Sequence, residues 1–182
     1  MIDISEIDNT WTLFLDRDGV INKRIPGGYV TKKDDFIFLP NVMGSLTNIC
    51  RKFARVIVVT NQQGVGKGLM TREQLDDIHD YMRDEMGLYK GFVDEVYSAC
   101  ELESDPNNTR KPKPDLALQA QKDFPEIDFK KSIMVGDTDN DIIFGKNLGM
   151  KTVLVLSDEL GFEEADLEVD SLWEFAEMII YR

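Results

Sequence analysis

Short apolar runs alternate with longer stretches of helical periodicity along most of the sequence. The clearest run, 55–60 (RVIVVT), is almost entirely apolar and β-branched, which is typical of a strand buried on both faces of a sheet. Similar runs predict strands at 11–15, 92–98, 132–135 and 152–156, with a short edge strand at 167–169. This alternation predicts an α/β fold, in which a doubly wound, mainly parallel sheet carries helices on both faces.

The segments between these strands carry start signals of helices. Thr71-Arg72-Glu73-Gln74 has the pattern of a capping box, in which the first and last side chains bond each other's backbone N–H groups. A last helix is expected from Ser171, where Glu174 would complete a second capping box. Further helices are predicted over 41–53, from 114 onward and over 139–148.

Composition limits the classes of partner. The chain has 182 residues, of which 42% are hydrophobic and 30% charged, so we expect one globular domain spanning residues 1–182. Its 21 Lys and Arg and 34 Asp and Glu give a net charge of 21 − 34 = −13. A surface with this excess of acid repels nucleic acid and anionic membranes, so we expect neither as a partner. Any site for a phosphorylated small molecule must be locally positive.

Cysteine content and hydropathy indicate a cytoplasmic location. Only Cys50 and Cys100 occur, which argues against a disulfide framework and for a reducing compartment. The first ten residues lack the basic start and apolar stretch of a signal peptide, and no apolar run approaches the ~20 residues of a membrane span. We expect a monomer that acts on a small-molecule substrate.

Polar side chains follow three of the predicted strands, at the edge where a parallel sheet binds ligands. Asp16 and Asp18 follow the first strand, Thr60 and Asn61 end the second, and Asp137 follows the fourth. Carboxylates gathered in this way repel one another unless a hard cation lies between them, and Mg²⁺ prefers such oxygen ligands. The sequence therefore predicts a magnesium site. A calcium loop over Asp137, Asp139 and Asp141 is rejected, because the later glycine and glutamate are missing.

This constellation suits phosphate transfer. Asp16 is the candidate nucleophile, which would form an aspartyl-phosphate, and Asp18 the candidate acid that protonates the leaving group. The Thr60 hydroxyl and a lysine, for which we choose Lys111, would bind the phosphate oxygens. Arg110 beside it could grip a second phosphate, or else pair with an acid such as Asp105.

The motifs resemble those of the haloacid dehalogenase superfamily of phosphatases, from Thr12 to about Ser157. The four matching segments are Asp16-Arg17-Asp18-Gly19-Val20, Thr60-Asn61, Arg110-Lys111-Pro112 and Gly136-Asp137-Thr138-Asp139-Asn140-Asp141. The resemblance implies a Rossmann-like fold with Mg²⁺ bound by the Asp16 and Asp137 side chains and the Asp18 main-chain carbonyl. It also implies that Asp141 is a supporting acid near the metal.

The gaps after the first and third strands are too short for a cap domain, so the chain resembles the capless branch. Within it, the sequence looks most like the D-glycero-D-manno-heptose 1,7-bisphosphate phosphatases, with histidinol-phosphate phosphatases as the alternative. The loops that favour the first family are Gly28-Tyr29-Val30 and Gly64-Val65-Gly66-Lys67-Gly68. Gly28, Tyr29, Asn61, Lys67 and Arg110 are accordingly the predicted substrate-binding residues.

One departure concerns zinc. Both families commonly hold a structural zinc through a cysteine, a histidine and two further cysteines in the loop after the third strand. This chain keeps only Cys100, with Leu102, Asn107 and Thr109 near the other positions, so we predict no structural zinc.

Other interpretations of the sequence are weaker. A nucleotide P-loop would need glycine where Asn61 stands and Ser or Thr where Gly68 stands. His79, the single histidine, is expected to be a partly exposed helix residue. A receiver-like signalling domain would share the phosphorylated aspartate and magnesium, but it would not need an acid at Asp18. A catalytically inactive binding module is disfavoured, because every catalytic position is occupied.

Overall fold

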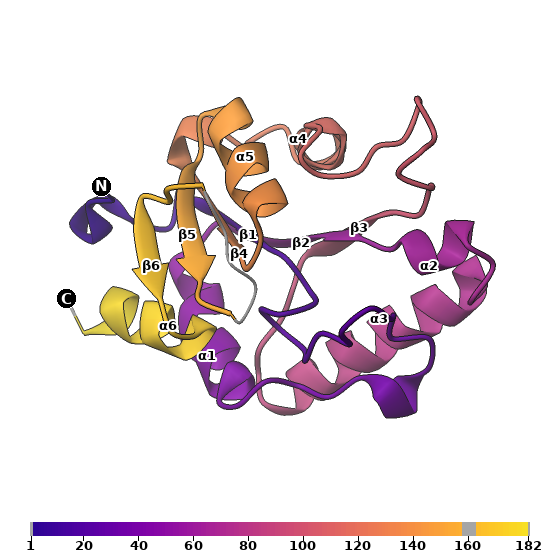
Figure 1. Cartoon of the computed structure of the whole chain (residues 1–182). Helices are drawn as coiled ribbons and strands as arrows, with labels where there is room; N and C mark the ends of the chain where they lie inside the picture. The colour runs from indigo at the N-terminus through magenta and orange to yellow at the C-terminus, as the bar shows by residue number, and fades with distance from the viewer. Residues whose placement is uncertain (1, 158–162, 182) are drawn as a thin grey trace.

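The computed structural model describes residues 2–157 and 163–181, which form a six-stranded sheet flanked by helices (Figure 1). The strand order is β3-β2-β1-β4-β5-β6, and all neighbours are parallel. The strands are β1 (Thr12–Leu15), β2 (Arg55–Asn61), β3 (Glu95–Ala99), β4 (Ser132–Gly136), β5 (Lys151–Val155) and β6 (Leu167–Val169). The predicted α/β fold is confirmed.

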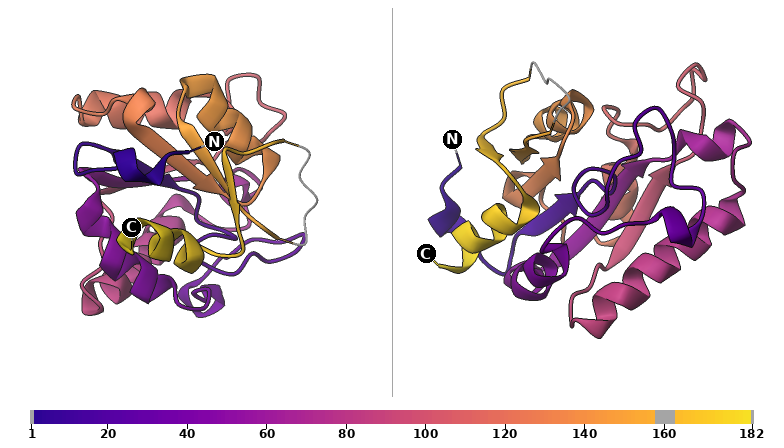
Figure 2. Two further views of the ribbon diagram at one scale, coloured as in Figure 1. Left: turned by 90° about the vertical axis from the view of Figure 1, so that its left-hand side faces the viewer. Right: turned by 60° about the horizontal axis from the view of Figure 1, so that its bottom comes forward.

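Helices cover both faces of this sheet. One layer contains α1, α3 and α6, and the other contains α4 and α5 (Figures 1 and 2). The α-helices are α1 (Val42–Ile49), α2 (Gln63–Gly66), α3 (Arg72–Leu88), α4 (Asp115–Asp123), α5 (Asp139–Leu148) and α6 (Leu172–Ile180). Short 3-10 helices are η1 (Ile4–Glu6), η2 (Lys33–Asp35), η3 (Cys50–Lys52) and η4 (Phe129–Lys131).

The two layers bury opposite faces of each strand. Leu13 and Leu15 pack with the residues of α1, α3 and α6, whereas Phe14 between them packs with α4 and α5. This follows from the two-residue period of a strand, which sends successive side chains to opposite faces. Because the central strands are apolar on both faces, the polar residues at their ends lie at the edge of the sheet rather than within it.

Several local predictions can be compared with the structure. Thr71 and Gln74 form the predicted capping box. The second box is wrong in part, because the Glu174 carboxylate accepts from the N–H of Asp170 and not from that of Ser171. The third strand was predicted from residue 92 and begins three residues later, at Glu95. The helix predicted over 41–53 ends at residue 49, where η3 follows it.

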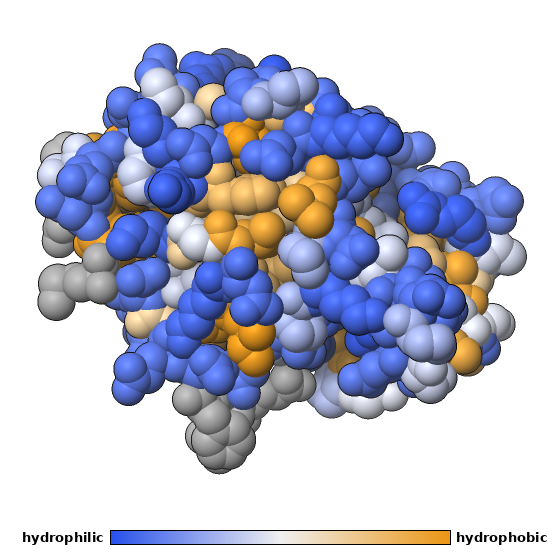
Figure 3. Space-filling view, turned by 90° about the horizontal axis from the view of Figure 1, so that it is seen from above, coloured by the Kyte–Doolittle hydropathy of each residue, from blue (hydrophilic) through white to orange (hydrophobic). Residues whose placement is uncertain are grey.

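No cap domain interrupts the described parts of the chain. The connection from β1 to α1 contains only η2, and β2 is joined to β3 through α2 and α3. None of the helices in residues 2–157 and 163–181 is both long and apolar enough to span a membrane. The face above α4 and α5 is mostly hydrophilic, with hydrophobic side chains gathered toward its centre (Figure 3).

Candidate active site

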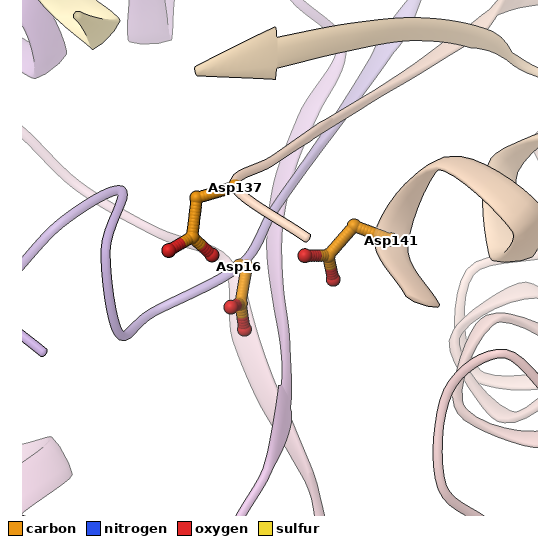
Figure 4. Close-up of side chains that lie close together, drawn as sticks. All are labelled: Asp16, Asp137 and Asp141. Atoms are coloured by element: carbon orange, nitrogen blue, oxygen red, sulfur yellow. The ribbon is translucent and has the colours of Figure 1, made fainter. Parts of the chain in front are cut away.

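Three buried carboxylates meet at the carboxyl edge of the central strands. Asp16 directly follows β1, Asp137 follows β4, and Asp141 lies in the first turn of α5. One oxygen of each lies within 4.8 Å of one oxygen of each of the others, and the carboxylates face one another (Figure 4). The parallel pairing of β1 with β4 thus places Asp16 and Asp137, which the sequence predicts at one edge of the sheet, next to each other.

Two glycines allow the acids to approach so closely. Gly19 has a φ of +98°, and a Cβ there would lie 1.9 Å from Oδ2 of Asp137. A Cβ on Gly136 would lie 2.1 Å from Cβ of Asp141. Any larger residue at these positions would therefore displace one of the carboxylates.

Burial raises the pKa values of two of these carboxyl groups. It raises the pKa of Asp16 to about 6, and Asp141 and Asp18 add to the rise while Lys111 opposes it. Burial also raises the pKa of Asp137 to about 7, with a further contribution from Asp16. Since both acids resist ionisation in these surroundings, a cation among their oxygens is stabilising.

Lys111 supplies one positive charge within the cluster. Its buried Nζ lies 2.8 Å from Oδ1 of Asp16 and 2.6 Å from Oδ1 of Asp141, and it donates to the main-chain oxygen of Val59 at 2.7 Å. Burial opposes this charge, but the two acids outweigh it and raise the pKa of Lys111. Asn61 holds the lysine's main chain, accepting from its N–H at 2.9 Å and donating to its oxygen at 3.1 Å. Both ends of the Asn61 amide are thus engaged in positioning Lys111, although Asn61 was predicted to bind substrate.

Asp18 is surrounded by hydrogen-bond donors. Its oxygens accept from Nη2 of Arg17 at 2.9 and 3.1 Å, from Nδ2 of Asn22 at 2.8 Å and from Nε2 of Gln62 at 2.8 Å. Burial raises the pKa of Asp18, but Arg17 and these amides outweigh it, so the net shift is downward. Gln62 also donates to the buried hydroxyl of Thr60 at 2.8 Å, which joins the ends of β1 and β2.

Arg24 is a site residue that the sequence analysis missed. Its guanidinium binds both oxygens of Asp137, at 2.6 and 3.1 Å, and the main-chain oxygen of Asp18 at 2.9 Å. It also lies 3.9 Å from Oδ2 of Asp16. A cationic side chain thus contacts the three groups that were expected to bind the metal, which shows directly that this oxygen set suits a cation. No sequence signal marks Arg24, since it lies in a loop without periodicity.

A cleft of about 360 Å³ opens over Asp16 and Lys111. It brings together nearly all of the predicted site residues: Asp16, Asp18, Gly28, Tyr29, Thr60, Asn61, Lys67, Arg110, Lys111 and Asp141 line it, together with Arg24. Asp137 does not line the cleft itself, but it accepts a hydrogen bond from Arg24, which does. At the mouth, Nζ of Lys67 donates to the hydroxyl of Tyr29 at 2.9 Å and lies 5.1 Å from the centre of its ring.

Known proteins share this sequence and architecture. The family model for HAD-hydrolase-like proteins matches residues 108–174. A D-glycero-alpha-D-manno-heptose-1,7-bisphosphate 7-phosphatase of Mycobacterium bovis is 35% identical over 170 residues, covering 91% of this chain and 90% of that protein. A D-glycero-beta-D-manno-heptose-1,7-bisphosphate 7-phosphatase of Helicobacter pylori is 34% identical over 146 residues, covering 80% and 82% respectively. The crystal structure of the D,D-heptose 1,7-bisphosphate phosphatase of B. bronchiseptica, complexed with magnesium and phosphate, matches with a TM-score of 0.85 and 25% identity, covering 94% of this chain and 98% of that one.

This chain belongs to the haloacid dehalogenase-like phosphatases. The family resemblance carried by the four motifs is confirmed, and so is the prediction of a phosphoric monoester hydrolase. The receiver-like signalling domain and the inactive binding module are set aside, because the relatives that cover nine-tenths of the chain are phosphatases.

In this phosphatase, Arg110 does not form the alternative ion pair. Within residues 2–157 and 163–181, no ion pair joins it to Asp105. Its backbone N–H donates to Oδ1 of Asn108 at 3.2 Å, which fixes the main chain. Arg110 lines the cleft, and its buried Nη1 has no hydrogen-bond partner among the residues that the structure describes. A buried donor left in this state is costly unless a ligand satisfies it.

The loop between β3 and α4, where zinc was considered, is ordered by its own hydrogen bonds. Nζ of Lys113 donates to the main-chain oxygens of Asn108 at 2.8 Å and Pro106 at 3.2 Å. The Thr109 hydroxyl donates to the carboxylate of Glu101 at 3.1 Å. The ammonium group of Lys113 thus holds two carbonyl oxygens of the loop and closes the turn that precedes Lys111.

The prediction for His79 is wrong. The residue is buried, and its Nε2 lies 3.1 Å from Nη1 of Arg17, 62 positions away in the chain. The reason lies in the helix period, since position 79 falls on the same face of α3 as Leu75 and Met82.

Proposed function

We propose that this phosphatase removes one phosphate from a sugar that carries two, with D-glycero-D-manno-heptose 1,7-bisphosphate as the best candidate. The relatives in M. bovis, H. pylori and B. bronchiseptica are named for that substrate. The observation that carries the proposal is Arg110, which lines the cleft together with Asp16 and whose buried Nη1 has no hydrogen-bond partner within the described part of the chain. A guanidinium at this place can grip a second, non-reacting phosphate and align the first for attack.

We propose that the reaction needs Mg²⁺. The side chains of Asp16 and Asp137 and the main-chain oxygen of Asp18 would hold it, with Asp141 supporting them, because all of these are oxygen donors in one buried cluster. When bound, the ion neutralises negative charge on the transferring phosphate. The Cys100–Thr109 loop is proposed to hold no zinc, since Lys113 and Thr109 already supply its internal bonds.

In the first half of the reaction, Asp16 is the nucleophile. Lys111 holds one oxygen of its carboxylate, which fixes the direction of attack. The Asp16 oxygen forms a bond to phosphorus while the bond to the sugar oxygen breaks, and Asp18 gives a proton to the departing alkoxide. Thr60 and Lys111 line the cleft beside Asp16, where they can bond the oxygens of the transferring group.

In the second half, water hydrolyses the aspartyl-phosphate. Asp18, now a carboxylate, takes a proton from the water as its oxygen bonds to phosphorus and the bond to Asp16 breaks. Inorganic phosphate leaves and both aspartates regain their starting states. The donors around Asp18 suit this half, because they stabilise the anionic form that must accept the proton. The first half needs Asp18 in its neutral form, so the proton must be taken up as the negatively charged substrate phosphate enters the cleft and disfavours a second anion beside it.

The test compares substrates in an Arg110→Ala variant. Both anomers of the heptose bisphosphate are assayed, since relatives act on either, together with histidinol phosphate and p-nitrophenyl phosphate. We expect kcat/KM for the bisphosphate to fall at least tenfold more than kcat/KM for p-nitrophenyl phosphate, because only the bisphosphate has a second anion. Arg51→Ala, an exposed arginine on η3, is the control and should change neither. Equal losses on both substrates, or faster hydrolysis of histidinol phosphate by the wild type, would remove the case for a bisphosphate.

We further propose that residues 1–182 act as one domain and as a cytoplasmic monomer. One sheet joins β3 to β6 across the described chain, and both cysteines are free thiols, which suits a reducing compartment. Sedimentation of the purified protein at micromolar concentration should give a mass near 20.8 kDa.

A further inference from the structure

Behind Asp18 lies a buried pair of side chains that the proposed chemistry does not use. Arg17 has no exposed surface, and its Nη2 contacts both oxygens of Asp18 while its Nη1 contacts Nε2 of His79. The guanidinium lies over the ring of Phe36, with Cζ of Arg17 5.7 Å from the centre of the ring. We propose that Arg17 and His79 form a positioning pair that holds Asp18 in the orientation needed for proton transfer.

The protonation states of this pair follow from its contacts. A guanidinium only donates, so Nε2 of His79 must present its lone pair to Arg17. Burial and the adjacent Arg17 lower the pKa of His79 to about 3, so the imidazole stays neutral and remains an acceptor at any working pH. His79 therefore cannot exchange protons with substrate, and its effect must pass through Arg17.

The geometry explains why two residues are needed to position one acid. Nη2 of Arg17 spans both oxygens of Asp18, which fixes the plane of the carboxylate, and Asn22 and Gln62 fix its edges. Nη1 of the same guanidinium is fixed by His79, which stands in the middle of α3. Asp18 lies on a loop at the cleft, so this chain of contacts anchors its position to a helix packed on the sheet.

Misplacement of the Asp18 carboxylate should slow hydrolysis of a sugar phosphate more than hydrolysis of p-nitrophenyl phosphate. Protonation of the leaving group matters for a sugar alkoxide, which is strongly basic, and hardly at all for p-nitrophenolate, which leaves without a proton. Because kcat/KM reports only the steps through departure of the leaving group, it isolates the acid role of Asp18 from its later role as base. The inference thus rests on the proposed function, in which Asp18 is the acid.

The experiment measures kcat/KM for heptose 1,7-bisphosphate and for p-nitrophenyl phosphate in His79→Leu, His79→Gln and Arg17→Lys. We expect His79→Leu to lower the bisphosphate value roughly 10- to 100-fold, the range for a small misplacement of a catalytic group, with p-nitrophenyl phosphate much less affected. His79→Gln should recover most of the loss, because its amide oxygen can accept from Arg17. Arg17→Lys should resemble His79→Leu, since an ammonium cannot reach Asp18 and His79 together.

Two controls separate positioning from stability and from the proposed function. Met86→Ala opens a cavity in the same helix without touching Arg17, so it should lower the melting temperature and leave the ratio of the two kcat/KM values unchanged. Asp18→Asn should show the largest change in that ratio. If Asp18→Asn leaves the ratio unchanged, the acid role itself is wrong. The positioning inference is overturned if Asp18→Asn changes the ratio but His79→Leu and Arg17→Lys do not. In that case these two variants would lower kcat/KM equally for both substrates, or for neither. Arg17→Lys decides the matter should His79→Leu fail to fold.

Discussion

Replacing Asp16, the proposed nucleophile, by Asn should make the metal-free protein more stable while it abolishes turnover. Burial raises the pKa of Asp16 from 3.8 to about 6, so at neutral pH folding forces a charge into surroundings that resist it. Asn has nearly the shape of the neutral acid and carries no charge. In Asp16→Asn, Lys111 would keep its ion pair with Asp141 at 2.6 Å and its bond to the Val59 oxygen, so the variant leaves no cation unpaired.

The size and sign of the effect follow from the shift. A rise of about two pKa units corresponds to roughly 3 kcal/mol between the two protonation states. Because the pKa of Asp16 is higher in the folded than in the unfolded chain, its neutral form favours folding. That contribution is complete below pH 3.8 and is lost as the pH rises through about 6. The variant should therefore match the wild type near pH 4 and exceed it by up to roughly 3 kcal/mol above pH 7, or about 6–12 °C in Tm for a chain of this size.

Thermal unfolding in EDTA between pH 4 and pH 8 measures this difference. Adding Mg²⁺ should then raise the Tm of the wild type and barely change that of Asp16→Asn, which lacks one of the proposed ligands. A variant that is no more stable than the wild type at pH 8, or a difference that does not grow with pH, would refute the argument that the charge of Asp16 destabilises the fold. Retained turnover would refute its role as the nucleophile.

Two further predictions concern cations. Arg24→Gln should tighten Mg²⁺ binding several-fold in calorimetry, because Arg24 occupies oxygens of Asp137 and Asp18 that the ion would need. The same variant should lower the Tm in EDTA, because it leaves the buried acid without its cationic partner. Weaker Mg²⁺ binding would show instead that the guanidinium assists the ion. Elemental analysis of the purified protein should find no stoichiometric zinc, and one zinc per chain would contradict the proposal for the loop that Lys113 closes.

The sequence was sufficient to predict residues whose position depends on the sheet alone. Asp16, Thr60 and Asp137 each end or follow an apolar run, and parallel strands must deliver their ends to one edge. Lys111 was chosen because phosphate transfer needs a cation, and Asp141 came from a family motif; the structure brings both into the same cluster. The rule for parallel sheets and the family motifs thus contributed different members of the site.

Contacts made by irregular loops were beyond sequence reasoning. Arg24 reaches Asp137 across 113 positions from a loop whose path depends on local turns rather than on a repeating pattern. His79 was a different kind of miss, because its spacing from Leu75 and Met82 places it on the buried face of α3. The helix period could have predicted its burial, but nothing in the sequence identifies Arg17 as its partner.

The charges of the site tie substrate binding to cation binding. A chain with a net charge of −13 repels a phosphate dianion at long range, so attraction must come from the cleft itself. Within the cluster, three carboxylates (Asp16, Asp137 and Asp141) face two cations (Arg24 and Lys111), which leaves 2 − 3 = −1 when all five are ionised. A divalent cation changes that sum to +1. The phosphate to be transferred is therefore repelled by the ionised cluster alone and attracted once the divalent ion has entered, which favours metal binding before substrate binding.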